Sequence, residues 1–109
     1  MSSQSATANH YGISERSFNR IVAAIATMPE IEEVVIFGSR AMGTARRGSD
    51  IDLAIKGARV TDRTADELSM TLNERLPIPY YVDVVAYPSL SHENLREHID
   101  TRGKLFYRK

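Results

Sequence analysis

The sequence predicts a small mixed α/β domain, in which a small central mixed β-sheet carries helices packed on one face. Three observations predict this class. The chain has 109 residues, which suits one domain with one modest hydrophobic core. Three short runs rich in β-branched residues, at 34–37, 51–55 and 82–87, are typical of strands. Stretches with the apolar periodicity of amphipathic helices lie around them.

The helices are expected around and between these strands. The first is expected to begin after an N-cap at Ser14 and to end before Pro29. Further helices are expected over 61–76 and 91–100, and the KLFY run after Gly103 is expected to add a short edge strand. The predicted order is therefore α-β-β-α-β-α with a small final element. The first helix has four apolar side chains at i, i+3, i+4 and i+7: Phe18, Ile21, Val22 and Ile25.

Composition limits the possible classes of protein. Residues 1–12 are mostly small and polar, so we expect a flexible N-terminal tail followed by a single domain at 13–109. The 14 basic and 14 acidic residues balance, which gives no sign of a nucleic-acid or membrane partner. The absence of cysteine excludes disulfides and thiolate metal sites. No apolar run is long enough to span a membrane, and we expect a cytoplasmic protein.

Three aspartates are candidates for a metal site. Side chains alternate along a strand, so Asp50 and Asp52 share one face of the run at 51–55, opposite its apolar side chains. Asp83 joins them if the run at 82–87 is the neighbouring strand. Converging carboxylates raise one another's pKa, and a bound Mg²⁺ or Mn²⁺ removes that cost. The alternatives are a solvated strand-end aspartate and, for Asp83, an edge-strand charge that discourages aggregation.

A glycine–serine turn precedes the aspartates. Gly38-Ser39 ends the first strand, where backbone N–H groups and the serine hydroxyl can hold a phosphate. Arg40, Arg46 and Arg47 bring positive charge to the same loop, although an exposed basic loop explains the last two equally well. The spacing and the lysine of a P-loop are absent. The turn and the aspartates together suit a metal-bound nucleoside triphosphate.

These residues resemble a known family. Gly38-Ser39, ten residues and then Asp50-Ile51-Asp52 form the G-S-x10-D-x-D signature of the DNA polymerase β-like nucleotidyltransferase superfamily. The stretch GSRAMGTARRGSDIDLAI and the later YVDVV resemble the minimal nucleotidyltransferase (MNT) family in particular. The resemblance covers about residues 14–107. It implies a nucleotidyltransferase fold without a separate acceptor domain.

The resemblance also implies roles for individual residues. Asp50, Asp52 and Asp83 would be the catalytic residues and would hold two Mg²⁺ ions, with Mn²⁺ as an alternative metal. Asp83 would also orient or deprotonate the acceptor hydroxyl. ATP is the expected substrate, and its binding residues would be Gly38, Ser39, Arg40 and Ser49.

Small MNT proteins resemble the antitoxin half of HEPN/MNT toxin–antitoxin pairs. The resemblance implies transfer of AMP from ATP to a tyrosine of a HEPN-type ribonuclease toxin, with which this chain would form a hetero-oligomer. We expect this chain itself to make no direct contact with nucleic acid. The short chain independently favours a partner, because it leaves no room for an acceptor domain. The alternatives are transfer to a small hydroxylated molecule such as an aminoglycoside, and an antitoxin that masks its partner without chemistry.

Histidines and tyrosines carry weaker signals. His10, His92 and His98 have no ligand spacing, so we expect no zinc site. Tyr80 or Tyr81, just before the third strand, is a candidate to flank the nucleotide base.

Overall fold

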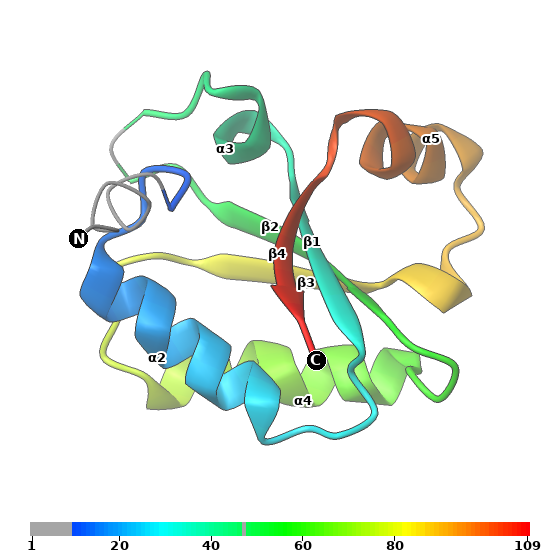
Figure 1. Ribbon diagram of the computed structural model, residues 1–109, viewed down its shortest axis with the longest axis horizontal. Helices are drawn as coiled ribbons and strands as arrows, with labels where there is room; N and C mark the ends of the chain where they lie inside the picture. The colour runs from blue at the N-terminus through cyan, green and yellow to red at the C-terminus, as the bar shows by residue number, and fades with distance from the viewer. Residues whose placement is uncertain (1–9, 47) are drawn as a thin grey trace.

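A four-stranded mixed sheet forms the centre of the computed structural model, which describes residues 10–46 and 48–109. In the order β3-β2-β1-β4, β1 runs antiparallel to both β2 and β4, and β2 runs parallel to β3. The predicted mixed α/β class and all four predicted strands are confirmed (Figure 1). The strands are β1 (Glu33–Phe37), β2 (Ile51–Lys56), β3 (Val82–Ala86) and β4 (Lys104–Arg108).

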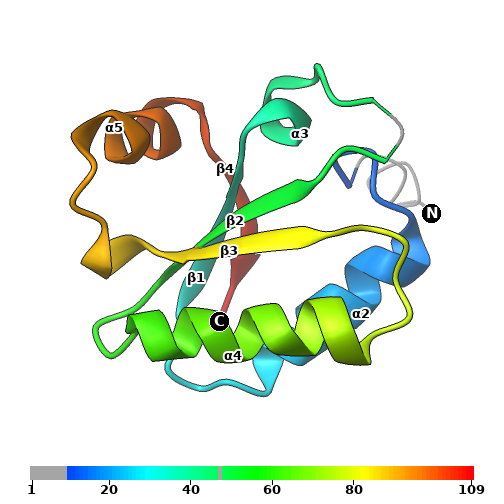
Figure 2. The ribbon, with the colours of Figure 1, turned by 180° about the vertical axis from the view of Figure 1, so that it is seen from behind.

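Two helices, α2 (Glu15–Ala26) and α4 (Asp62–Met70), cover one face of the sheet, as Figures 1 and 2 show. The predicted helix at 61–76 is α-helical only to Met70 and continues as the π-helical turn η1 (Thr71–Arg75). Helix α5 (Glu93–Arg102) lies on the other side of the sheet, and the short helix α3 (Ser39–Met42) follows the end of β1 directly. A 3₁₀ turn, η2 (Tyr87–Ser89), follows β3.

The sheet has two cores of unequal size. The larger lies under α2 and α4 and holds most of the fully buried side chains. The smaller lies on the opposite face, where Ile99 of α5 packs with Val35, Phe37 and Ala54. Because these three strand residues are apolar, the second face must also be shielded from water, and α5 packs on it. The sequence predicted helices on one face only, so α5 is an addition to that expectation.

Side-chain capping explains where helices α2 and α4 begin. The Ser14 hydroxyl accepts a hydrogen bond from the Ser17 N–H at 3.2 Å, which confirms the predicted N-cap. Thr61 and Thr64 form a reciprocal capping box at the start of α4.

Replacing Leu68 by alanine tests the larger core. This α4 side chain is fully buried, so the substitution should lower the free energy of unfolding by about 2–5 kcal/mol. Thermal denaturation should show a fall in the melting temperature of about 10 °C or more. The matched control is Glu67→Ala, because Glu67 is exposed on the same helix. A similar loss in both variants would contradict the position assigned to α4.

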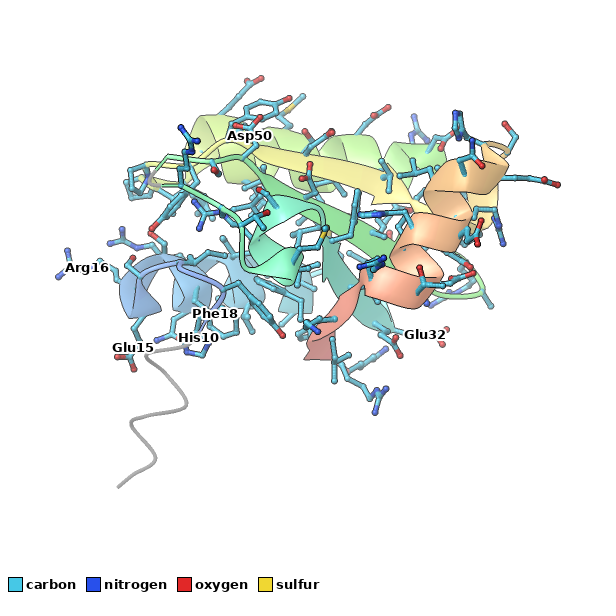
Figure 3. The ribbon with its side chains drawn as sticks, turned by 90° about the horizontal axis from the view of Figure 1, so that it is seen from above. His10, Glu15, Arg16, Phe18, Glu32 and Asp50 are labelled. Carbon is cyan, nitrogen blue, oxygen red and sulfur yellow. The ribbon has the colours of Figure 1, made fainter. Side chains whose placement is uncertain are left out.

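The described part of the N-terminal segment packs against the domain. His10 stacks on Phe18 with ring centroids 3.7 Å apart (Figure 3). The Tyr11 hydroxyl donates a hydrogen bond to the Leu105 carbonyl at 2.8 Å. Residues 1–9 of the predicted tail lie outside the described residues. No helix in the described ranges is long and apolar enough to cross a membrane.

Candidate active site

Asp52 and Asp83 face each other across two neighbouring strands. The parallel pairing of β2 with β3 places Asp52 directly opposite Asp83. Asp52 also pairs with Phe37 of β1, and Phe37 belongs to the smaller core. Since side chains alternate along a strand, both carboxylates lie on the α5 side of the sheet, away from the larger core. The sheet therefore supplies the shared face that the sequence predicts for these two acids.

Asp50 is placed differently. It precedes the first residue of β2 and is exposed, so the sheet pairing does not hold it (Figure 3). Its charge nevertheless acts on Asp52. Within residues 10–46 and 48–109, no three His, Cys, Asp or Glu side chains stand close enough to hold a metal ion as they are. A metal would have to draw the carboxylates together.

The electrostatics of Asp52 reflect this crowding. Partial burial raises the pKa of the Asp52 carboxyl above its usual value, and the negative charges of Asp83 and then Asp50 raise it further. His98 has a smaller opposite effect. An acid held next to two others is costly to ionise, and a cation bound among them would remove that cost.

Gly38 lies directly against the Asp52 carboxylate. Its backbone has φ 80° and ψ −155°, a combination that is essentially restricted to glycine. A Cβ built on Gly38 would stand 2.5 Å from Asp52 Oδ2. Glycine is therefore required here twice, by the backbone conformation and by the approach of the carboxylate. The Gly38-Ser39 turn and the Asp52 carboxylate are therefore packed directly against each other.

Ser39 begins α3 immediately after this turn. Its carbonyl accepts a hydrogen bond from the Thr44 N–H at 3.0 Å, which holds the loop that follows α3. In the described part of the chain its hydroxyl makes no hydrogen bond and is partly exposed. The hydroxyl can therefore meet a ligand that approaches Asp52.

The buried Arg40 side chain is hydrogen-bonded to the backbone of Ser49. Arg40 is only 5% exposed, and its Nε and Nη2 donate to the Ser49 carbonyl at 3.1 and 2.8 Å. The Ser49 hydroxyl accepts a hydrogen bond from the Arg46 N–H at 2.8 Å. Both residues were predicted to bind nucleotide. In this structure they order the loop that leads to Asp50.

His98 is a site residue that the sequence reasoning missed. The Gly38 N–H donates to His98 Nε2 at 3.3 Å, and the imidazole meets the Phe37 ring edge-on. No ligand spacing marked this histidine, because its neighbours come from strands far away in the chain. The available signal was its place one helical turn after Leu95, which packs against the smaller core, since residues three apart share a helix face.

The remaining predicted residues stand at the border of the site. Tyr80 lies under the Arg40 guanidinium, with Cζ 5.0 Å from the ring centroid, and Tyr81 is 56% exposed. A cavity of about 470 Å³ is lined by Tyr80, Tyr11, Arg40 and Arg46 among others. Arg47 lies outside the described residues.

The Asn73 side chain is hydrogen-bonded to the first residue of β3, the strand that carries Asp83. Its Nδ2 donates to the Val82 carbonyl and its Oδ1 accepts from the Val82 N–H, both at 2.8 Å. The π-helical turn places this amide at the edge of the sheet, a use of irregular helix seen at functional sites. The position of Asp83 therefore depends on a side chain nine residues earlier than Val82.

Asn73→Ala should therefore loosen β3. Leaving two backbone groups without their partner should lower the free energy of unfolding by about 1–3 kcal/mol. Hydrogen exchange of the Val82 amide should accelerate by at least about tenfold. Asn73→Asp keeps the acceptor oxygen and should retain the protection of Val82 better than alanine. Equal protection in wild type and Asn73→Ala would contradict this role.

The donor set fits a hard divalent cation. All three acids offer oxygen, the ligand type that Mg²⁺ and Mn²⁺ prefer, and no nitrogen or sulfur ligand is required. The Asp52 carboxylate lies directly against Gly38, so a group held at the turn would lie next to this oxygen ligand. Burial first, and then the negative charges of Asp83 and Asp50, raise the pKa of the Asp52 carboxyl, and a bound cation would offset both effects.

Comparisons with known proteins agree with this geometry. The family model described as "Polymerase beta, Nucleotidyltransferase" matches residues 19–109. A chain in the crystal structure of a toxin–antitoxin with AMP-PNP is 30% identical with a TM-score of 0.69, and the match covers 84% of this chain and 73% of that one.

Two further solved structures match with a probability of 1.00. In a Shewanella oneidensis complex of a tri-AMPylated HEPN toxin with an MNT antitoxin, the match has 25% identity, a TM-score of 0.64 and coverage of 87% and 72%. In an MntA–HepT toxin–antitoxin structure the match has 24% identity and a TM-score of 0.65, and it covers 88% of this chain and 74% of that one. This likeness supports the fold alone. The search of curated proteins found no match. The chain therefore belongs to the polymerase β-type nucleotidyltransferase family, which confirms the resemblance to its minimal, antitoxin-type members.

Proposed function

We propose that this protein transfers AMP from ATP to a tyrosine hydroxyl of a HEPN-type toxin, in a Mg²⁺-dependent reaction that makes it the antitoxin of that toxin. The observation that carries the proposal is the pairing of Asp52 with Asp83 beside Gly38. Support for the partner comes from the similar structures, which are toxin–antitoxin complexes, one with AMP-PNP and one with a tri-AMPylated toxin.

The residues divide the chemistry between them. The Gly38-Ser39 turn would hold the triphosphate, and Asp50, Asp52 and Asp83 would hold Mg²⁺. When bound, Mg²⁺ supplies positive charge that stabilises the attacking and leaving oxygens. Asp83 is exposed and open to an incoming hydroxyl, whose proton it would accept. The acceptor oxygen then bonds to the α-phosphorus, the bond to the β-phosphate oxygen breaks, and pyrophosphate leaves.

The test is a mass measurement. Incubation with ATP, Mg²⁺ and the proposed HEPN-type partner should add one AMP, or several, to that toxin. Peptide mapping should place the addition on a tyrosine, and EDTA should prevent it. An unmodified toxin, in the presence of active ATP and metal, would exclude protein adenylylation.

Two other outcomes correspond to the alternatives. Labelling of a small hydroxylated molecule, with no labelling of the toxin, would make that molecule the acceptor. Neutralisation of the toxin by Asp52→Asn as efficiently as by wild type would show an antitoxin that masks its partner without chemistry.

A further inference from the structure

We infer that Arg40 is a positioning residue, which holds Asp50 where it can bind metal, and not a ligand of the nucleotide phosphates. The inference rests on the proposed function, because it concerns the metal site of the same reaction. It starts from the contrast between Asp50 and the other two acids. Asp52 and Asp83 are held by strand pairing, whereas Asp50 lies before β2 and needs another support.

The Arg40 guanidinium supplies that support. Two of its nitrogens, Nε and Nη2, converge on the carbonyl of Ser49, the residue directly before Asp50. A third, Nη1, donates to the Tyr11 carbonyl at 3.0 Å. The guanidinium therefore joins α3, the N-terminal segment and the start of the strand that carries the acids. These directional bonds fix the peptide to which Asp50 is attached.

The same group reaches the strand of Asp83. Its Cζ lies 5.0 Å from the centroid of the Tyr80 ring, a cation–π distance. The next residue, Tyr81, accepts a hydrogen bond on its carbonyl from the Ile51 N–H at 2.9 Å. Arg40 thus packs where the chain enters β2 and β3 together. A shift of this side chain would move the acids relative to each other.

Burial argues against a phosphate role. Arg40 is 5% exposed, and in the described residues no carboxylate lies within ion-pair distance of it. Removing a guanidinium from water is costly unless its N–H groups are bonded, and here they meet carbonyls and an aromatic ring. A phosphate that took up Nε or used the Nη2 and Nη1 donors now bonded to Ser49 and Tyr11 would have to break these bonds. A lysine would keep the charge, but its single ammonium could not reach both carbonyls and also stack on the ring.

The experiment measures metal and phosphate binding separately, without the partner protein. Arg40→Lys should weaken Mn²⁺ binding, measured by calorimetry or by Mn²⁺ electron paramagnetic resonance, by about tenfold. Binding of inorganic tripolyphosphate in EDTA should stay within about twofold of wild type. Arg20→Lys is the matched control, because Arg20 also donates to a carbonyl, that of Pro77, on an exposed part of the molecule. It should change neither affinity.

A double-mutant cycle tests whether Arg40 acts through Asp50. Asp50→Asn alone should weaken Mn²⁺ binding, and adding Arg40→Lys to it should weaken binding by less than about twofold more. Equal effects of Arg40→Lys in both backgrounds would overturn the inference. Weaker tripolyphosphate binding by Arg40→Lys in EDTA would overturn it too, in favour of a phosphate ligand.

Two variants of Tyr80 test the inference if Arg40→Lys misfolds. If Arg40→Lys does not fold, Tyr80→Leu removes the stacking ring and should weaken Mn²⁺ binding several-fold, whereas Tyr80→Phe should not. Equal Mn²⁺ binding by these two would overturn the inference. If wild type binds Mn²⁺ and transfers AMP while Arg40→Lys behaves as Arg20→Lys, only the inference fails. If wild type neither binds Mn²⁺ nor transfers AMP, the proposed function fails together with the inference.

Discussion

Replacing Asp52 by asparagine is expected to abolish nucleotidyl transfer and, at the same time, to stabilise the metal-free protein. The loss should be at least about a thousandfold, because in the proposed reaction this carboxylate is the central metal ligand and the metal contributes several kcal/mol of charge stabilisation. The stabilisation follows from the cost of ionising Asp52, which is partly buried and is also repelled by Asp83 and Asp50. Removing one of three like charges relieves it without changing the shape of the side chain.

The sign of the pH dependence follows from the raised pKa of Asp52 in the folded protein. Below about pH 4, the ordinary range of an aspartate, this carboxyl is protonated in both states and carries no penalty. As the pH rises through its folded pKa, the folded state must ionise the crowded acid and loses stability. The advantage of Asp52→Asn over wild type should therefore be absent near pH 4 and present at pH 7.

Thermal melting in EDTA measures this advantage. At pH 7 the midpoint of Asp52→Asn should exceed that of wild type by about 2–4 °C, since a fraction of a kcal/mol moves a domain of this size by that amount. Mn²⁺ should raise the midpoint of wild type and leave that of the variant unchanged. Asp66→Asn, an exposed acid on α4, is the control and should show neither effect. A variant less stable than wild type in EDTA would contradict the repulsion.

Gly38→Ala is expected to damage both the fold and the reaction. The backbone conformation costs alanine about 1–3 kcal/mol, because φ 80° with ψ −155° is a glycine region. The new Cβ would also stand 2.5 Å from Asp52 Oδ2, so the carboxylate must move. Misplacing a metal ligand by about 1 Å can cost a hundredfold in rate. We expect transfer to fall by about that factor or more.

Gly43→Ala separates the two causes. Gly43 has a left-handed φ of 78°, but a Cβ there would meet no atom within 4 Å. This variant should lose about 1–2 kcal/mol of stability and keep its transfer rate. Melting temperatures and rates of AMP transfer, measured side by side, give the comparison. Equal losses of rate in the two variants would mean that backbone strain, and not the displaced carboxylate, explains the effect of Gly38→Ala.

The local elements were predictable because their causes are local. Strand β2 has Ile51, Leu53 and Ile55 on one face and Asp52 on the other, and this period of two is read directly from the sequence. The N-cap at Ser14 and the end of α2 near Pro29 follow from the chemistry of single residues. The π-helical turn after Met70 was not predicted, because it serves the Asn73 bonds to a strand that folds against it.

The candidate site was predictable only in part. The alternation of side chains placed Asp83 on the face of Asp52 only on the condition that their strands are neighbours, and the pairing of β2 with β3 meets that condition. The burial of Arg40 was not predictable, because an arginine beside a turn is usually exposed. His98 was missed because its contact with Gly38 joins residues sixty positions apart.

The amino-acid sequence by itself determined the strands, the helix starts, the glycine–serine turn and the alternation that sets Asp52 opposite the apolar side chains of its own strand. Each of these depends on residues that are neighbours in the chain. Tertiary structure alone decided the order β3-β2-β1-β4, the position of α5 beside Gly38 and the direction of the Arg40 guanidinium. These features depend on which distant segments can bury apolar surface and complete one another's hydrogen bonds, and those partners exist only after the chain has folded.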